Sequence, residues 1–93
     1  MEAITISGNL AADCEPKTDK KGHSYIRFIV ACESKDVLGK PRTNNYRCFC
    51  YNTQFENLKK GDFVVVSGSF NVNEYKGKIS FDIYVQQIAS TKQ

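Results

Sequence analysis

The feature that most constrains the fold of this chain is a two-residue period of apolar side chains. Ile26, Phe28, Val30 and Cys32 alternate with other residues, and Ile79, Phe81, Ile83 and Val85 do the same near the end of the chain. Such alternation is typical of a β-strand with one buried face. Segments rich in apolar and β-branched residues predict five strands, at 3–12, 24–34, 44–51, 62–71 and 78–89.

The segments between these strands carry turn and loop residues. The stretches 13–23 and 35–43 are polar, contain Gly and Pro, and are expected to be exposed loops. Lys76-Gly77 offers the positive φ angle of a tight hairpin turn. Gly8 interrupts the first strand, where a glycine often marks a bulge or a bend.

The only helix that the sequence predicts is short and covers residues 53–58, between the third and fourth strands. Thr53 would cap its start, and Gly61 would end it. Five strands with a short helix at this position predict an all-β fold, a five-stranded OB-fold barrel. A five-stranded open sandwich is the alternative, which periodicity alone does not separate from the barrel.

Length and composition limit the classes of protein to consider. With 93 residues, we expect a single domain over residues 1–93. No apolar run reaches the ~20 residues of a membrane span, and no signal peptide is evident, so we expect a cytoplasmic protein without a membrane partner. The net charge of +3 permits a polyanionic partner without requiring one.

The residues that usually carry catalysis or bind metals are sparse. Cys14, Cys32, Cys48 and Cys50 form no CxxC pair, and His23 is the one histidine. We interpret the cysteines as reduced core residues and His23 as solvated. No nucleophile–base pair, phosphate loop or helical HExxH is present, so we expect neither an enzyme nor a cofactor or metal site.

The third predicted strand is the most informative about function. Tyr46, Cys48 and Cys50 share one face, and Asn45, Arg47, Phe49 and Tyr51 share the other. If the cysteines point inward, two aromatic rings and a guanidinium point outward, where unpaired bases stack on rings and cations contact phosphates. Packing alone, or the inverted orientation, is the alternative explanation. Further candidates on matching faces or nearby loops are Arg27, Tyr75, Lys35, Lys76 and Lys78.

Several motifs, in order, resemble the bacterial single-stranded DNA-binding protein (SSB) family, including its PriB-like relatives. They are Ile4-Thr5-Ile6-Ser7-Gly8-Asn9-Leu10, then Tyr25-Ile26-Arg27-Phe28-Ile29-Val30-Ala31, then Leu58-Lys59-Lys60-Gly61-Asp62 leading into a Val-rich strand with Ser67-Gly68, and finally Asn73-Glu74-Tyr75. The resemblance extends from about residue 4 to residue 88. It implies an OB-fold that binds single-stranded DNA with little sequence preference, in DNA replication, recombination or repair, as a homo-oligomer (a dimer or tetramer) paired through its first strands at 3–7.

The resemblance also implies roles for single residues. Tyr51 and Tyr75 match stacking positions, Arg47 matches a basic DNA-contacting position, and Phe49 lies between Arg47 and Tyr51 on the same face. Asn45 and the region of Lys35 stand where relatives carry further aromatics, so those stacking positions are expected to be absent.

The chain also departs from typical SSB proteins at its end. It stops at Gln93 without the acidic tail that recruits replication proteins, so we expect no recruitment through such a tail. PriB-like members share this feature. A PriB-like primosome or replication adaptor acting through protein contacts is therefore one alternative function, and single-stranded RNA binding is another.

Overall fold

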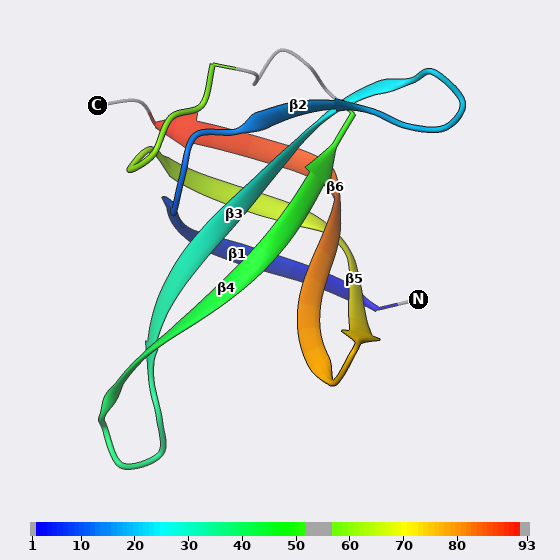
Figure 1. Ribbon diagram of the computed structural model, residues 1–93. Helices are drawn as coiled ribbons and strands as arrows, with labels where there is room; N and C mark the ends of the chain where they lie inside the picture. Colours follow the sequence, from blue (N-terminus) through cyan, green and yellow to red (C-terminus); the bar gives the residue numbers. More distant parts are fainter. Residues whose placement is uncertain (1, 52–56, 92–93) are drawn as a thin grey trace.

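The computed structural model describes residues 2–51 and 57–91, which form six β-strands (Figure 1). None of these residues is helical. The predicted helix at 53–58 lies mostly outside the described residues. The strands are β1 (Ala3–Leu10), β2 (Glu15–Thr18), β3 (Ser24–Lys35), β4 (Pro41–Cys50), β5 (Phe63–Tyr75) and β6 (Lys78–Thr91). The prediction of an all-β chain is confirmed.

Five of these strands close into a barrel, so the OB-fold prediction is confirmed and the open sandwich is wrong. The sheet has the order β1-β5-β6-β4-β3-β2, and an additional pairing of β1 with β3 closes the ring. All neighbours are antiparallel except β4 and β6, which are parallel. The parallel pairing places side by side two strands between which the whole of β5 intervenes in the sequence.

The prediction that residues 13–23 form only a loop is wrong, because Glu15–Thr18 forms β2. It pairs antiparallel with the start of β3, from Glu15 opposite Arg27 to Thr18 opposite Ser24. All four residues of β2 are exposed. Its stability therefore comes from main-chain hydrogen bonds at a sheet edge, and a strand without a buried face leaves no apolar period in the sequence.

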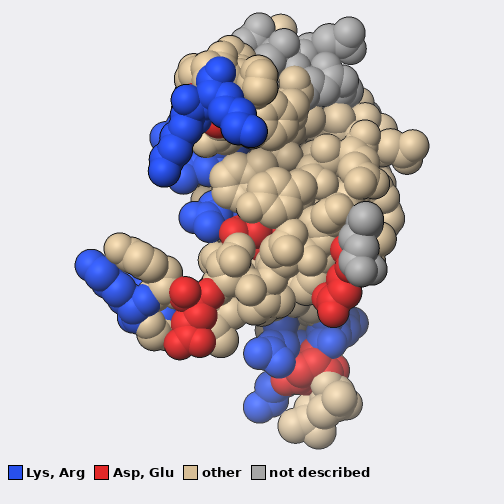
Figure 2. Space-filling model, turned by 90° about the vertical axis from the view of Figure 1, so that its right-hand side faces the viewer, with Lys and Arg blue, Asp and Glu red and all other residues tan. Residues whose placement is uncertain are grey.

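Two long hairpins extend from the barrel, β3–β4 and β5–β6 (Figure 1), and lobes project separately from the body in the space-filling view (Figure 2). The predicted turn at Lys76-Gly77 is confirmed, since both residues have positive φ angles of 51° and 79°. Of the predicted apolar face of β6, Ile83 is fully buried, but Ile79 and Phe81 are exposed. The reason is that this part of the hairpin lies beyond the layer of buried side chains.

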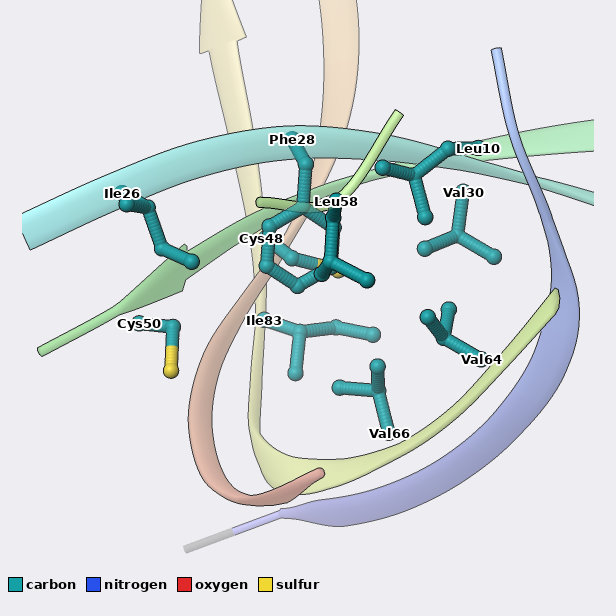
Figure 3. Close-up of a cluster of buried hydrophobic side chains, with 10 residues drawn as sticks. All are labelled: Leu10, Ile26, Phe28, Val30, Cys48, Cys50, Leu58, Val64, Val66 and Ile83. Carbon is teal, nitrogen blue, oxygen red and sulfur yellow. The ribbon is translucent and has the colours of Figure 1, made fainter. Parts of the chain in front are cut away.

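The core is a single cluster of side chains inside the barrel. The close-up in Figure 3 shows these side chains, from different strands, pointing toward one another. They are Leu10, Ile26, Phe28, Val30, Cys48, Cys50, Leu58, Val64, Val66 and Ile83. Burial raises the pKa of the Cys48 thiol to about 12, so this thiol stays protonated at neutral pH. Cys48 and Cys50 therefore act as core residues, as predicted.

Two glycines allow the strands to cross closely enough to close the barrel. A Cβ atom at Gly8 would lie 2.3 Å from the main-chain oxygen of Ala31 in β3, and one at Gly68 would lie 2.1 Å from that of Tyr84 in β6. The β5–β6 register also shifts between Ser67 and Gly68, which marks a bulge. Any side chain at these positions would push apart the main chains that close the ring.

Replacing Gly8 with alanine is expected to destabilise the fold by about 1–3 kcal/mol or more, because main-chain atoms cannot move aside as a flexible side chain can. Gly39→Ala is the matched control. Gly39 has open space around its Cα but a φ of 81°, so only backbone strain of about 1–2 kcal/mol is expected. Urea denaturation of both variants measures the difference. Equal losses would contradict the close crossing at β3.

Candidate nucleic-acid interface

Four aromatic rings form a continuous row on the outer face of β3, β4 and β6. We call this row, Tyr51, Tyr25, Phe49 and Tyr84, the aromatic strip. Ring centroids are 5.3 Å apart for Tyr51–Tyr25, 6.1 Å for Tyr25–Phe49 and 5.5 Å for Phe49–Tyr84. Tyr51 is 55% exposed and Tyr84 is 48% exposed. Such a row of accessible rings is unusual for a surface that contacts only water.

The orientation of β4 produces the strip. Cys48 and Cys50 are buried, so the alternation along β4 turns Phe49 outward, as predicted. Tyr51, which directly follows the strand, is also exposed and contacts Tyr25 as Phe49 does. Register then supplies the neighbours, because Phe49 lies opposite Arg27 on β3 and opposite Tyr84 on β6. The predicted residues Arg27, Phe49 and Tyr51 are thus brought together on one face.

The sequence interpretation did not identify Tyr25 and Tyr84 as site residues. A signal for Tyr25 existed, since it lies two positions before Arg27 on the same face of one strand. Tyr84 offered no such signal, because its place beside Phe49 depends on the parallel pairing of β4 with β6. Strand pairing between distant segments is not encoded in local periodicity.

Arg47 lies next to the strip, but its charge is already engaged by another residue. Its Nε and Nη2 atoms donate hydrogen bonds of 2.9 Å to the two carboxylate oxygens of Asp82. The guanidinium carbon also lies 5.3 Å from the centroid of the Phe49 ring. Hydrogen bonding to Asp82 raises the pKa of Arg47, which stays positively charged. The predicted basic contact is therefore half of an internal ion pair.

Asp82 is the most buried charged residue that the structure describes, with 2% of its surface exposed. It accepts a further hydrogen bond from the side-chain amide of Asn73. Burial alone would raise the pKa of Asp82, but the hydrogen bonds from Arg47 and Asn73 and the charge of Arg47 outweigh it. They hold this pKa below its ordinary value of 3.8. Asp82 is consequently ionised at neutral pH.

The turn between β2 and β3 is attached to one end of the strip. The Tyr51 hydroxyl donates a 3.1 Å hydrogen bond to Asp19, whose carboxylate also accepts from the main-chain N–H groups of Lys21 and His23. Loss of solvation and the bond to Asp19 raise the pKa of Tyr51. The turn that carries the exposed Lys20 and Lys21 is thereby attached to the Tyr51 hydroxyl, a contribution that the sequence interpretation missed.

The other predicted cations lie around the strip rather than on it. Arg27 donates a 3.0 Å bond to Glu15, so its charge is partly neutralised. Tyr75, Lys76 and Lys78 lie at the tip of the β5–β6 hairpin, where Tyr75 is 73% exposed and the Lys76 Nζ atom lies 5.4 Å from its ring centroid. Lys35 ends β3, on the separate β3–β4 hairpin. In Figure 2 the Lys and Arg side chains form separate groups, with other residues, Asp and Glu among them, between the groups.

Replacing Asp82 with asparagine is expected to lower the free energy of unfolding at pH 7 by about 1–3 kcal/mol, since the amide has no charge and only one oxygen to accept from Arg47 and Asn73. The pKa of Asp82 is lower in the folded than in the unfolded chain. Its stabilisation is therefore present above about pH 4 and lost as the pH falls through the folded pKa. Urea denaturation from pH 7 down to about pH 2 should show the two proteins converging. A constant difference at all pH values would contradict the ionised pair.

Among the described residues, no helix is long and apolar enough to span a membrane.

Comparison with known proteins places this chain in a family. No curated protein sequence matches the chain. Among solved structures, a small single-stranded DNA-binding protein from Streptomyces coelicolor is similar with a TM-score of 0.74 and 23% identity, over 97% of this chain and 93% of that one. The Plasmodium falciparum SSB in complex with ssDNA is similar with a TM-score of 0.78 and 18% identity, over 99% of this chain and 96% of that one. At these identities the likeness establishes the OB-fold.

The model of the single-strand binding protein family, whose members are non-enzymatic binding proteins, matches residues 1–92, and the chain belongs to that family.

Proposed function

We propose that this protein binds single-stranded DNA with little sequence preference, by stacking bases on the aromatic strip. The observation that carries this proposal is the row of four rings with centroids 5.3–6.1 Å apart on one face of the barrel, of which Tyr51 and Tyr84 are exposed and Tyr25 and Phe49 half-buried. Stacking on an aromatic side chain contributes about 1–3 kcal/mol per base and tolerates every base, because each base has a π face. Membership of the single-strand binding protein family and the DNA-bound P. falciparum neighbour support the same function.

The phosphates would be contacted by cations on the β2–β3 turn and on the β5–β6 hairpin. Lys20 and Lys21 lie beyond Tyr51, and Lys76 and Lys78 lie on the β5–β6 hairpin with Tyr75. Arg27 would contribute from β3, and Lys35 from the β3–β4 hairpin. Since phosphate contacts release condensed counterions, affinity should fall steeply as salt increases. Between the two hairpins lies a hollow lined by Ile29, Asn45, Arg47, Ile79, Ser80 and Phe81, which would continue the path of the strand.

We further propose that the protein works as a homo-oligomer in the cytoplasm, in replication, recombination or repair. The β1 strand supports self-association. Ala3–Gly8 pairs with β5, but only Asn9 and Leu10 also pair with β3, so the other edge of Ala3–Gly8 has no strand partner among the described residues. An unpaired strand edge readily accepts another strand.

Removing Tyr51 from the strip, together with the exposed Tyr75 at the tip of the β5–β6 hairpin, tests whether bases stack on these rings. The double variant Tyr51→Ala/Tyr75→Ala is expected to bind labelled oligo-dT at least about tenfold more weakly, because two bases can no longer stack on accessible rings. Fluorescence anisotropy gives the affinity, and circular dichroism checks that the fold is retained.

Phe63→Ala is the control for this experiment. It removes a 38% exposed ring at the start of β5, a strand that pairs with β1 and β6 and not with β3 or β4. Binding by this variant should stay unchanged. Unchanged binding by the Tyr51/Tyr75 variant would refute base stacking on these rings.

The same assay separates the alternative functions. Equal affinity for dT and U oligomers would extend the function to RNA. A stable oligomer of the protein that binds neither oligonucleotide would favour an adaptor role.

The β2–β3 turn is expected to bind phosphates. Lys20→Ala/Lys21→Ala should weaken binding to all sequences alike and reduce the slope of log affinity against log salt by about 0.7 for each phosphate that these lysines neutralise in the wild type. Lys59→Ala/Lys60→Ala removes the same charge from the loop between Leu58 and β5, far from the β2–β3 turn (Figure 1), and serves as the matched control. A similar weakening in both variants would mean that net charge, rather than this turn, attracts DNA.

A further inference from the structure

The ion pair between Arg47 and Asp82 has a consequence for how the strip binds DNA. A guanidinium beside a base-stacking surface is ordinarily assigned to phosphate binding. Here Nε and Nη2 of Arg47 are both held by the Asp82 carboxylate, and Nη2 also lies 3.5 Å from the Ser80 hydroxyl. The positive charge is thus compensated within the protein, and two of the donor nitrogens that would grip a phosphate are occupied.

The position of Arg47 fits a different role. Its side chain is 39% exposed, and its guanidinium carbon lies 5.3 Å from the Phe49 centroid. Phe49 in turn contacts Tyr25 and Tyr84. The guanidinium is planar and weakly hydrated, so it stacks on flat groups as an aromatic ring does. Arg47 therefore extends the aromatic strip toward the hollow between the two hairpins, whose lining includes Arg47 and Ile79.

The Asp82 carboxylate also connects the strip to the β5–β6 hairpin. Asp82 lies on β6, Arg47 on the neighbouring β4, and Asn73, which donates to the same carboxylate, on β5. Asn73 is only two residues before Tyr75, the exposed ring at the hairpin tip. The buried Asp82 carboxylate thus holds both the Arg47 side chain and Asn73, which lies near the tip of the hairpin that carries Tyr75.

Resting on the proposed function, we infer that Asp82 is a positioning residue that turns Arg47 from a phosphate contact into a charge-compensated stacking surface. A base that stacks on Arg47 adds to the affinity without adding to its salt dependence. The inference separates two classes of cation at this site. Lys20, Lys21, Lys76 and Lys78 act on phosphates, and Arg47 acts on bases.

The test measures oligo-dT affinity across a series of salt concentrations for the wild type and four variants. Arg47→Lys keeps the charge but removes the planar group, so it should bind about fivefold or more weakly with an unchanged salt slope. Arg47→Met should also bind more weakly. Because that variant leaves Asp82 without its cation, Arg47→Met/Asp82→Asn is measured beside it and should again leave the slope unchanged. Asp82→Asn alone leaves the charge of Arg47 uncompensated and should steepen the slope by about 0.7.

A phosphate-binding Arg47 gives the opposite pattern. Arg47→Lys would then bind almost as the wild type does, and Arg47→Met/Asp82→Asn would flatten the slope by about 0.7. Either result would overturn the inference while leaving the proposed function intact. A wild-type protein that binds no oligo-dT would overturn the proposed function, and this inference with it. Circular dichroism of each variant ensures that the comparison is made between folded proteins.

Discussion

The alternation of side chains along β4 is the constraint on which the rest of the site depends. Cys48 and Cys50 fill the barrel interior, where small thiols fit between Ile26, Phe28 and Ile83. Because successive side chains of a strand point to opposite faces, Phe49 and Tyr51 must point outward. The same strand therefore stabilises the core and exposes the rings. A shift of one residue in register would exchange the two faces and remove both features together.

Closure of the barrel turns these outward rings into a continuous surface. The parallel pairing of β4 with β6 places Tyr84 beside Phe49 and Asp82 beside Arg47, and the antiparallel pairing with β3 places Arg27 beside Phe49. Gly8 and Gly68 permit the close strand crossings that this closure needs. The face that carries the aromatic strip is thus a consequence of strand order, and residues far from it, such as Gly8 and Gly68, help to set that order.

The two arginines beside the strip are paired with carboxylates, whereas exposed lysines lie on the β2–β3 turn and the β5–β6 hairpin. Arg47 is paired with Asp82, and Arg27 with Glu15, whereas Lys20, Lys21, Lys76 and Lys78 lie on exposed turns. The net charge of only +3 gives no hint of this arrangement. Flat, weakly charged surface suits the bases of a single strand, and cations on these turns suit its phosphates.

The sequence by itself determined the five strands of the barrel, because their apolar side chains recur with a two-residue period. The sequence predicted that Phe49 and Tyr51 point outward and that Lys76-Gly77 forms a hairpin turn, and its motifs resemble those of the SSB family. It did not predict β2, whose four exposed residues carry no such period. Only the tertiary structure decided that Tyr25 and Tyr84 join the strip and that Asp82 is buried against Arg47. Those contacts arise between strands that are distant in the chain, and the period within one strand carries no information about which strand will lie beside it.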